Sequence, residues 1–146
     1  MASRELESMY QQVILDHAKE KHGYGLRGGE AASSHQINPT CGDEVTLHLH
    51  RAADGTIESI SWEGQGCSIS TASASVLNDL VHELTPEETT RRIAAFRELM
   101  QSKGEIEGDD ELLGDAVVLG GVSRYVTRIK CAMLPWVALE DTLARS

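Results

Sequence analysis

The sequence predicts an α+β fold in which a small antiparallel sheet packs against several helices. Residues 45–50 alternate apolar and polar side chains, which is the period of a half-buried strand. The turn signal Asp54-Gly55 separates this run from a second strand-like run at 56–63, so the two runs form a hairpin. Apolar residues recur at helical spacing before and after the hairpin.

Length and charge limit the classes of protein to consider. The 146 residues, 40% of them hydrophobic, suit a single domain spanning 1–146. A net charge of -10 argues against a nucleic-acid partner and favours a protein partner with a basic docking surface. The chain shows neither a basic and apolar leader nor an apolar run of about 18 residues. We therefore expect a soluble cytoplasmic protein that does not enter a membrane.

The N-terminal third is predicted to hold one helix and a loop. Residues 3–20 carry an apolar stripe at helical spacing, made of Leu6, Met9, Tyr10, Val13, Ile14 and His17. His17 is expected to be partly buried with a local partner. Residues 22–34 are rich in glycine and small side chains and predict a loop. His48 and His50 lie on the strand face opposite Leu47, and we interpret that face as solvated.

The remaining chain is predicted to be helical. One helix starts just past Cys67, with Ser68 or Ser70 as its cap. Thr85, Pro86 and Glu88 form a capping-box start for another, which ends at Gly104. An acidic loop at 104–111 and a short helix at 112–119 follow. A last helix covers about 126–144, where Pro135 requires either a kink or a later start.

Three separated cysteines provide the chemical signal. They are Cys41, Cys67 and Cys131, and Asp43 follows the first of them by two positions. An odd number of cysteines without an export signal favours metal binding or thiol chemistry over disulfides. Three thiolates and one carboxylate make a complete ligand set for zinc. The hairpin brings the segments before and after it together, so these residues could meet; the alternative is that the cysteines are unconnected core residues.

Two smaller features lie near the cysteines. Gly64 and Gly66 precede Cys67, and we interpret them as a close backbone approach around a ligand-bearing turn, because the segment lacks the lysine of a phosphate loop. Arg128 lies three residues before Cys131 and could orient a thiolate or a partner carboxylate; a surface ion pair is the simpler interpretation.

The chain resembles the IscU/NifU-like sulfur and iron–sulfur assembly proteins, specifically the SufU branch. The resemblance runs over nearly the whole chain and is carried by residues 9–17, 38–43, 64–70 and 128–132. IscU-type scaffolds have a histidine just before the third cysteine, whereas this chain has Lys130. SufU-type proteins have an extra segment between the second and third cysteines, which residues 86–111 match.

The resemblance implies a SufE/NifU-like fold and a zinc-dependent sulfurtransferase. By position, Cys41 would accept persulfide sulfur, and Cys41, Asp43, Cys67 and Cys131 would hold zinc. The sulfur would come from SufS, a pyridoxal-phosphate cysteine desulfurase, and pass towards the SufBCD scaffold. One alternative is an IscU-like scaffold that builds a [2Fe–2S] cluster on the same ligands. Another is a non-catalytic zinc protein that activates the desulfurase by docking.

Overall fold

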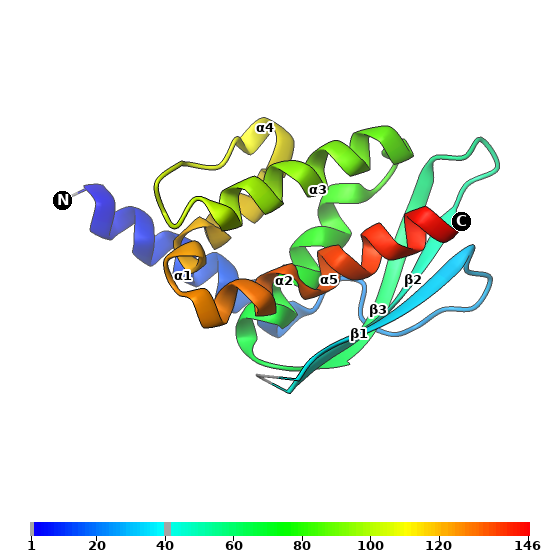
Figure 1. Ribbon diagram of the computed structural model, residues 1–146, viewed down its shortest axis with the longest axis horizontal. Coiled ribbons are helices and arrows are strands. Elements are labelled where there is room, and N and C mark those ends of the chain that lie inside the picture. Colours follow the sequence, from blue (N-terminus) through cyan, green and yellow to red (C-terminus); the bar gives the residue numbers. More distant parts are fainter. Residues whose placement is uncertain (1, 40–41) are drawn as a thin grey trace.

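A computed structural model describes residues 2–39 and 42–146, with side chains from Ser8 onward (Figure 1). The elements run in this order: α1 (Ala2–Glu20), β1 (Ala32–Asn38), β2 (Asp43–Arg51), β3 (Ile57–Gln65), α2 (Ser68–Val81), α3 (Pro86–Gln101), α4 (Asp110–Leu113), the 3-10 helix η1 (Gly114–Arg124) and α5 (Val126–Arg145). This is the predicted α+β class, with one antiparallel sheet and helices packed against it.

The sheet has the strand order β1-β2-β3, and both pairs of neighbours are antiparallel. The predicted hairpin is confirmed, with Leu47 opposite Trp62 and Leu49 opposite Ile60. The prediction of a loop through residue 34 is wrong, because β1 starts at Ala32. Its sequence has no apolar alternation, so pairing with the edge of β2, rather than local pattern, makes it a strand.

The face of the sheet that carries His48 and His50 is not bare. The segment 21–31 starts at the edge of β3, where Gly23 and Gly25 bond to the Trp62 backbone, and then crosses this face, where the Arg27 carbonyl lies 2.9 Å from His48 Nδ1. His50 is only 6% exposed, and its Nε2 lies 2.8 Å from Ser61 Oγ. The interpretation of this face as solvated is therefore wrong for His50, because a glycine-rich segment distant in sequence covers it.

The other face of the sheet forms the core with the helices. Val45, Leu47 and Leu49 are buried beneath α5, which packs on β1 and β2. Helix α2 packs against β3 and α5, and α1 lies along α2 at the side away from the sheet (Figure 1). Phe96 from α3 stacks on Trp136 from α5, with ring centroids 4.0 Å apart. The core therefore fixes the starts of β2, α2 and α5, the three points that the site uses.

Helix boundaries agree with the prediction where local capping decides them. Thr85 caps α3 in a full capping box with Glu88, and Pro86 is the first helical residue. Helix α3 ends at Gln101, three residues before the predicted Gly104, and the backbone turns through positive φ at Lys103 and Gly104. Cys67, rather than Ser68 or Ser70, is the N-cap of α2.

The predicted short helix at 112–119 is instead two consecutive elements, the one-turn helix α4 and the 3-10 helix η1. Helix α5 begins at Val126, so Pro135 lies inside it and does not delay its start. Met9 belongs to the predicted apolar stripe of α1 yet is 64% exposed. Within the part of the chain that the structure describes, every helix is too short or too polar to cross a bilayer.

Candidate metal centre

Asp43, Cys67 and Cys131 come together at one point. Each offers a ligand atom, and these three atoms lie within 4.8 Å of one another. Asp43 is the first residue of β2, Cys67 caps α2, and Cys131 lies in the second turn of α5. The hairpin brings the start of β2 to the end of β3, and α2 and α5 pack together, which explains how residues 24 and 64 positions apart meet.

The Asp43 carboxylate is held in place on one side and unsatisfied on the other. The residue is 2% exposed, and its Oδ1 accepts a hydrogen bond from the backbone N–H of Cys67 at 3.0 Å. Its Oδ2 is buried without a hydrogen-bond partner among the described residues. Because a buried, unpaired carboxylate oxygen is costly, an oxygen in this state fits a cation ligand. We expected Asp43 to precede the strand; it is instead built into it.

The glycines before Cys67 have the role predicted for them. A side chain at Gly64 would collide with the backbone carbonyl of Glu44, and one at Gly66 would meet Ser70 Oγ and Asp43 Oδ1. The backbone before Cys67 can therefore approach β2 only because no Cβ is present. This confirms the interpretation as a close backbone approach.

Gly42 allows a turn that other residues adopt rarely. Its φ is +75°, and its N–H donates to the Asn38 carbonyl at 2.9 Å. This left-handed turn leads directly into Asp43. Cys41 itself lies outside the described residues, so its place beside the other three ligands stays a prediction.

The two described thiols differ in access. Cys131 is fully buried, with its Sγ 3.8 Å from the Thr127 carbonyl, whereas Cys67 is half-buried. Cys67 stands at the N-terminal end of α2, where the helix dipole favours a negative charge. Soft thiolates with one carboxylate suit zinc better than magnesium or calcium. The chemistry of the donor set therefore fits the metal predicted from sequence.

A cleft of about 650 Å³ opens beside Cys67. Helix α1 forms one wall with Tyr10 and Ile14, and η1 and the start of α5 form the other with Val122 and Tyr125. Arg128 lines this cleft and is exposed, and Lys130 is exposed on α5. Neither belongs to the three-ligand cluster of Asp43, Cys67 and Cys131.

A second cluster, of His17, His22 and Asp79, was missed by sequence reasoning. Their ligand atoms also lie within 4.8 Å of one another. His17 is buried, and its Nδ1 lies 2.8 Å from Ser75 Oγ, 58 positions away, so the expected local partner is wrong. Hydrogen bonds to Asp79 and then to Glu20 raise the pKa of His22 above its usual value. The only sequence signal was a histidine continuing an apolar helical stripe.

Comparison with known proteins identifies the family of this small α+β protein with its cluster of one aspartate and two cysteines. Residues 9–132 match the NifU-like N-terminal domain. The chain therefore belongs to the NifU-like N-terminal domain family, to which IscU and SufU proteins are related.

Three relatives illustrate the range of this family. The iron–sulfur cluster assembly scaffold protein IscU of Streptococcus pyogenes is 40% identical, over 100% of this chain and 89% of its own. The zinc-dependent sulfurtransferase SufU of Bacillus subtilis is 39% identical, over 96% of this chain and 92% of its own. A solved structure from Fervidobacterium islandicum is described as a candidate iron–sulfur cluster assembly scaffold protein for the SUF system. It is 30% identical, covers 90% of this chain and 94% of its own, and superimposes with a TM-score of 0.79.

Proposed function

We propose that this protein is a zinc-dependent sulfurtransferase that accepts persulfide sulfur from a pyridoxal-phosphate cysteine desulfurase for iron–sulfur cluster assembly. The observation that carries the proposal is the convergence of Asp43, Cys67 and Cys131 beside an open cleft. The 39% identity to a protein named zinc-dependent sulfurtransferase supports it.

In this proposal Cys41, Asp43, Cys67 and Cys131 hold one zinc ion. When bound, zinc keeps its cysteine ligands as thiolates and protects them from oxidation. The orphaned Oδ2 of Asp43 supports its role as the oxygen ligand. Cys67 and Cys131 belong to helix starts that the core anchors, so they serve as the fixed ligands.

Cys41 is the proposed acceptor, because it comes just before the Gly42 turn, whereas Cys67 caps a helix and Cys131 lies within one. The Cys41 thiolate attacks the terminal sulfur of the desulfurase persulfide. A new S–S bond forms on Cys41, the old S–S bond breaks, and the desulfurase cysteine leaves as a thiolate. Electrons balance without an oxidant or reductant, and the Cys41 persulfide then serves the next acceptor.

The cleft beside Cys67 is the proposed entry for the desulfurase segment that carries the persulfide. Its rim holds the exposed Tyr125 and Arg128, a composition typical of protein contacts. The net charge of -10 favours a basic surface on the partner, and raised salt should weaken the encounter. We propose a desulfurase of the SufS type as the sulfur donor and a SufBCD-type scaffold as the downstream acceptor.

A second candidate is a scaffold on which a [2Fe–2S] cluster is assembled. The Streptococcus pyogenes relative, named a scaffold protein, supports it at 40% identity, and the same ligands would serve. Lys130, in place of the histidine of IscU-type scaffolds, favours the sulfurtransferase.

One experiment separates these candidates. Freshly purified protein is analysed for metal and visible absorption, then mixed with excess desulfurase and cysteine without reductant, and examined by mass spectrometry. A colourless protein with one zinc at the cysteine site and one added sulfur on Cys41 supports the sulfurtransferase. A coloured protein with iron and sulfide supports the scaffold, whereas zinc with no sulfur transferred to any cysteine supports activation by docking alone.

A further inference from the structure

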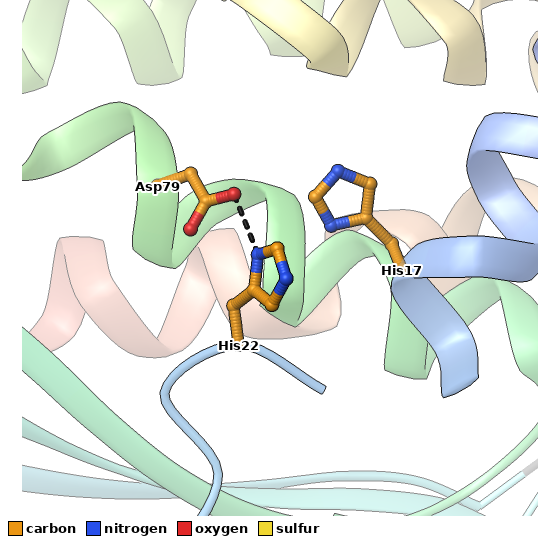
Figure 2. Close-up of side chains that lie close together, drawn as sticks. All are labelled: His17, His22 and Asp79. Atoms are coloured by element: carbon orange, nitrogen blue, oxygen red, sulfur yellow. Dashed lines mark hydrogen bonds and ion pairs between the residues drawn. The ribbon is translucent and has the colours of Figure 1, made fainter. Parts of the chain in front are cut away.

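His17, His22 and Asp79 come together beside the end of α2 that is distant from the cysteine site. Asp79 is twelve positions after Cys67 along α2, which corresponds to ~18 Å of helix. His17 comes from α1 and His22 from the turn that follows it (Figure 2). The cluster therefore joins three segments at a place that the proposed sulfur chemistry does not use.

The histidines face carboxylates on several sides. His22 Nδ1 lies 2.7 Å from Asp79 and its Nε2 lies 2.8 Å from Glu20. His17 Nε2 lies 3.2 Å from Asp115 Oδ2. A neutral imidazole has one N–H only, so His22 can satisfy both carboxylates only if a cation, either a second proton or a metal ion, takes one of its nitrogens.

The three carboxylates have few other positive partners. Among the described residues, Glu20, Asp79 and Asp115 form ion pairs with histidines, and none of the three pairs with a lysine or an arginine. Two neutral imidazoles and three carboxylates leave a local excess of negative charge. A divalent cation at this point would compensate that excess better than one proton does.

His17 is prepared for ligation by its surroundings. It is 5% exposed, and its Nδ1 is held by Ser75 Oγ at 2.8 Å. Its Nε2 lies 3.2 Å from Asp115 Oδ2, so both ring nitrogens have a hydrogen-bond partner, and the tautomer decides which of them donates. A hydrogen bond at the second ring nitrogen is the usual support of a metal-bound histidine.

We propose that His17, His22 and Asp79 form a second metal site, which binds a divalent transition-metal ion through nitrogen and oxygen ligands alone. Two imidazoles with carboxylates suit Zn²⁺ and its neighbours Co²⁺ and Ni²⁺. Ligands on one tetrahedral ion stand roughly 3.4 Å apart for bonds of about 2.1 Å. The atoms here are within 4.8 Å, and the partly exposed side chains of His22 and Asp79 can rotate to close that difference.

Such an ion would tie α1 and the turn after it to α2. Tyr10 and Ile14 of α1 form one wall of the cleft beside Cys67, so the second site would hold that wall in position. Glu20 contacts His22 and Asp115 contacts His17, so two further carboxylates surround the proposed site.

The test uses full-length protein whose cysteine site is first filled with one equivalent of Zn²⁺, followed by titration with Co²⁺. We expect a second bound equivalent whose visible spectrum has ligand-field bands without thiolate-to-cobalt charge transfer. Paramagnetic shifts of the His17 and His22 ring protons by NMR locate it. His22→Gln and Asp79→Asn, which keep hydrogen-bonding groups, should each weaken Co²⁺ binding at least tenfold.

His82→Gln is the matched control, because His82 is an exposed histidine just after α2 that forms an ion pair with Glu83 and lies outside the cluster. It should bind Co²⁺ as the unaltered protein does. The proposal is overturned if the zinc-filled protein takes up no second equivalent. It is also overturned if His22→Gln and Asp79→Asn both bind Co²⁺ with unaltered affinity, or if the shifted ring protons belong to other histidines.

Discussion

One oxygen of the Asp43 carboxylate accepts a hydrogen bond from the backbone N–H of Cys67 at 3.0 Å, which ties the first residue of β2 to the N-cap of α2. The other oxygen is buried and has no hydrogen-bond partner among the described residues. The same side chain can therefore position the loop before α2 and offer a ligand to a metal ion.

Two substitutions separate these roles of Asp43. Asp43→Asn can keep the hydrogen bond to Cys67 but loses the negative charge, whereas Asp43→Ala loses both. We expect both variants to lose most desulfurase stimulation, with Asp43→Asn melting closer to the unaltered protein. Sulfide and alanine production with a SufS-type desulfurase, and thermal melts, measure the two effects. Full stimulation by Asp43→Asn would show that the carboxylate charge is not needed.

Gly66→Ala should disturb the same contact from the other side. The new methyl group would meet Ser70 Oγ and lie 2.5 Å from Asp43 Oδ1. Overpacking of this kind costs about 1–3 kcal/mol of unfolding free energy, and zinc retention against a chelator should fall with it. Gly28→Ala is the control, since a Cβ there meets nothing within 4 Å. Equal denaturant midpoints for the two variants would contradict the close approach.

Removal of the metal should destabilise the fold. A metal ion held by Asp43, Cys67 and Cys131 would join the starts of β2, α2 and α5, and binding to the native state alone raises stability. We expect chelation to lower the melting temperature by at least about 5 °C, which corresponds to roughly 1–2 kcal/mol for a chain of this size. Cys67→Ala should have a lower melting temperature than the unaltered protein, and chelator should change that temperature little. An unchanged melt after verified metal loss would refute a bridging ion.

His50 should make stability depend on pH. Burial lowers its pKa below the usual value, and the nearby Arg27 and His48 lower it further. The His50 imidazole therefore binds a proton more readily in the unfolded chain. The His50 contribution to the free energy of unfolding should be highest above about pH 6.5 and should fall as the pH decreases towards 5.

Urea unfolding between about pH 7 and pH 5 measures this effect. The unaltered protein should lose more stability on acidification than His50→Gln. His82→Gln, at an exposed histidine, should keep the pH slope of the unaltered protein. A steeper loss in His50→Gln would give the opposite sign and contradict the assignment.

Local signals predicted the parts of the fold that local forces decide. The capping box of Thr85 and Glu88 is satisfied within four residues, and the hairpin follows from its turn and alternating strands. The approach of Asp43 to Cys67 was also predictable, because a hairpin brings its two ends together, whereas Cys131 joins them through the packing of α5 on α2. The expected place of Cys41 beside them stays a prediction.

Tertiary structure alone decided the rest. Strand β1 has no apolar alternation and exists because β2 offers it an edge, and His50 is buried because the segment 21–31 passes over it. His17, His22 and Asp79 meet only because α1 packs along α2. Spacing along a chain reports contacts within a turn or a hairpin, whereas contacts between separate elements depend on how whole faces pack, and the sequence by itself leaves that packing open.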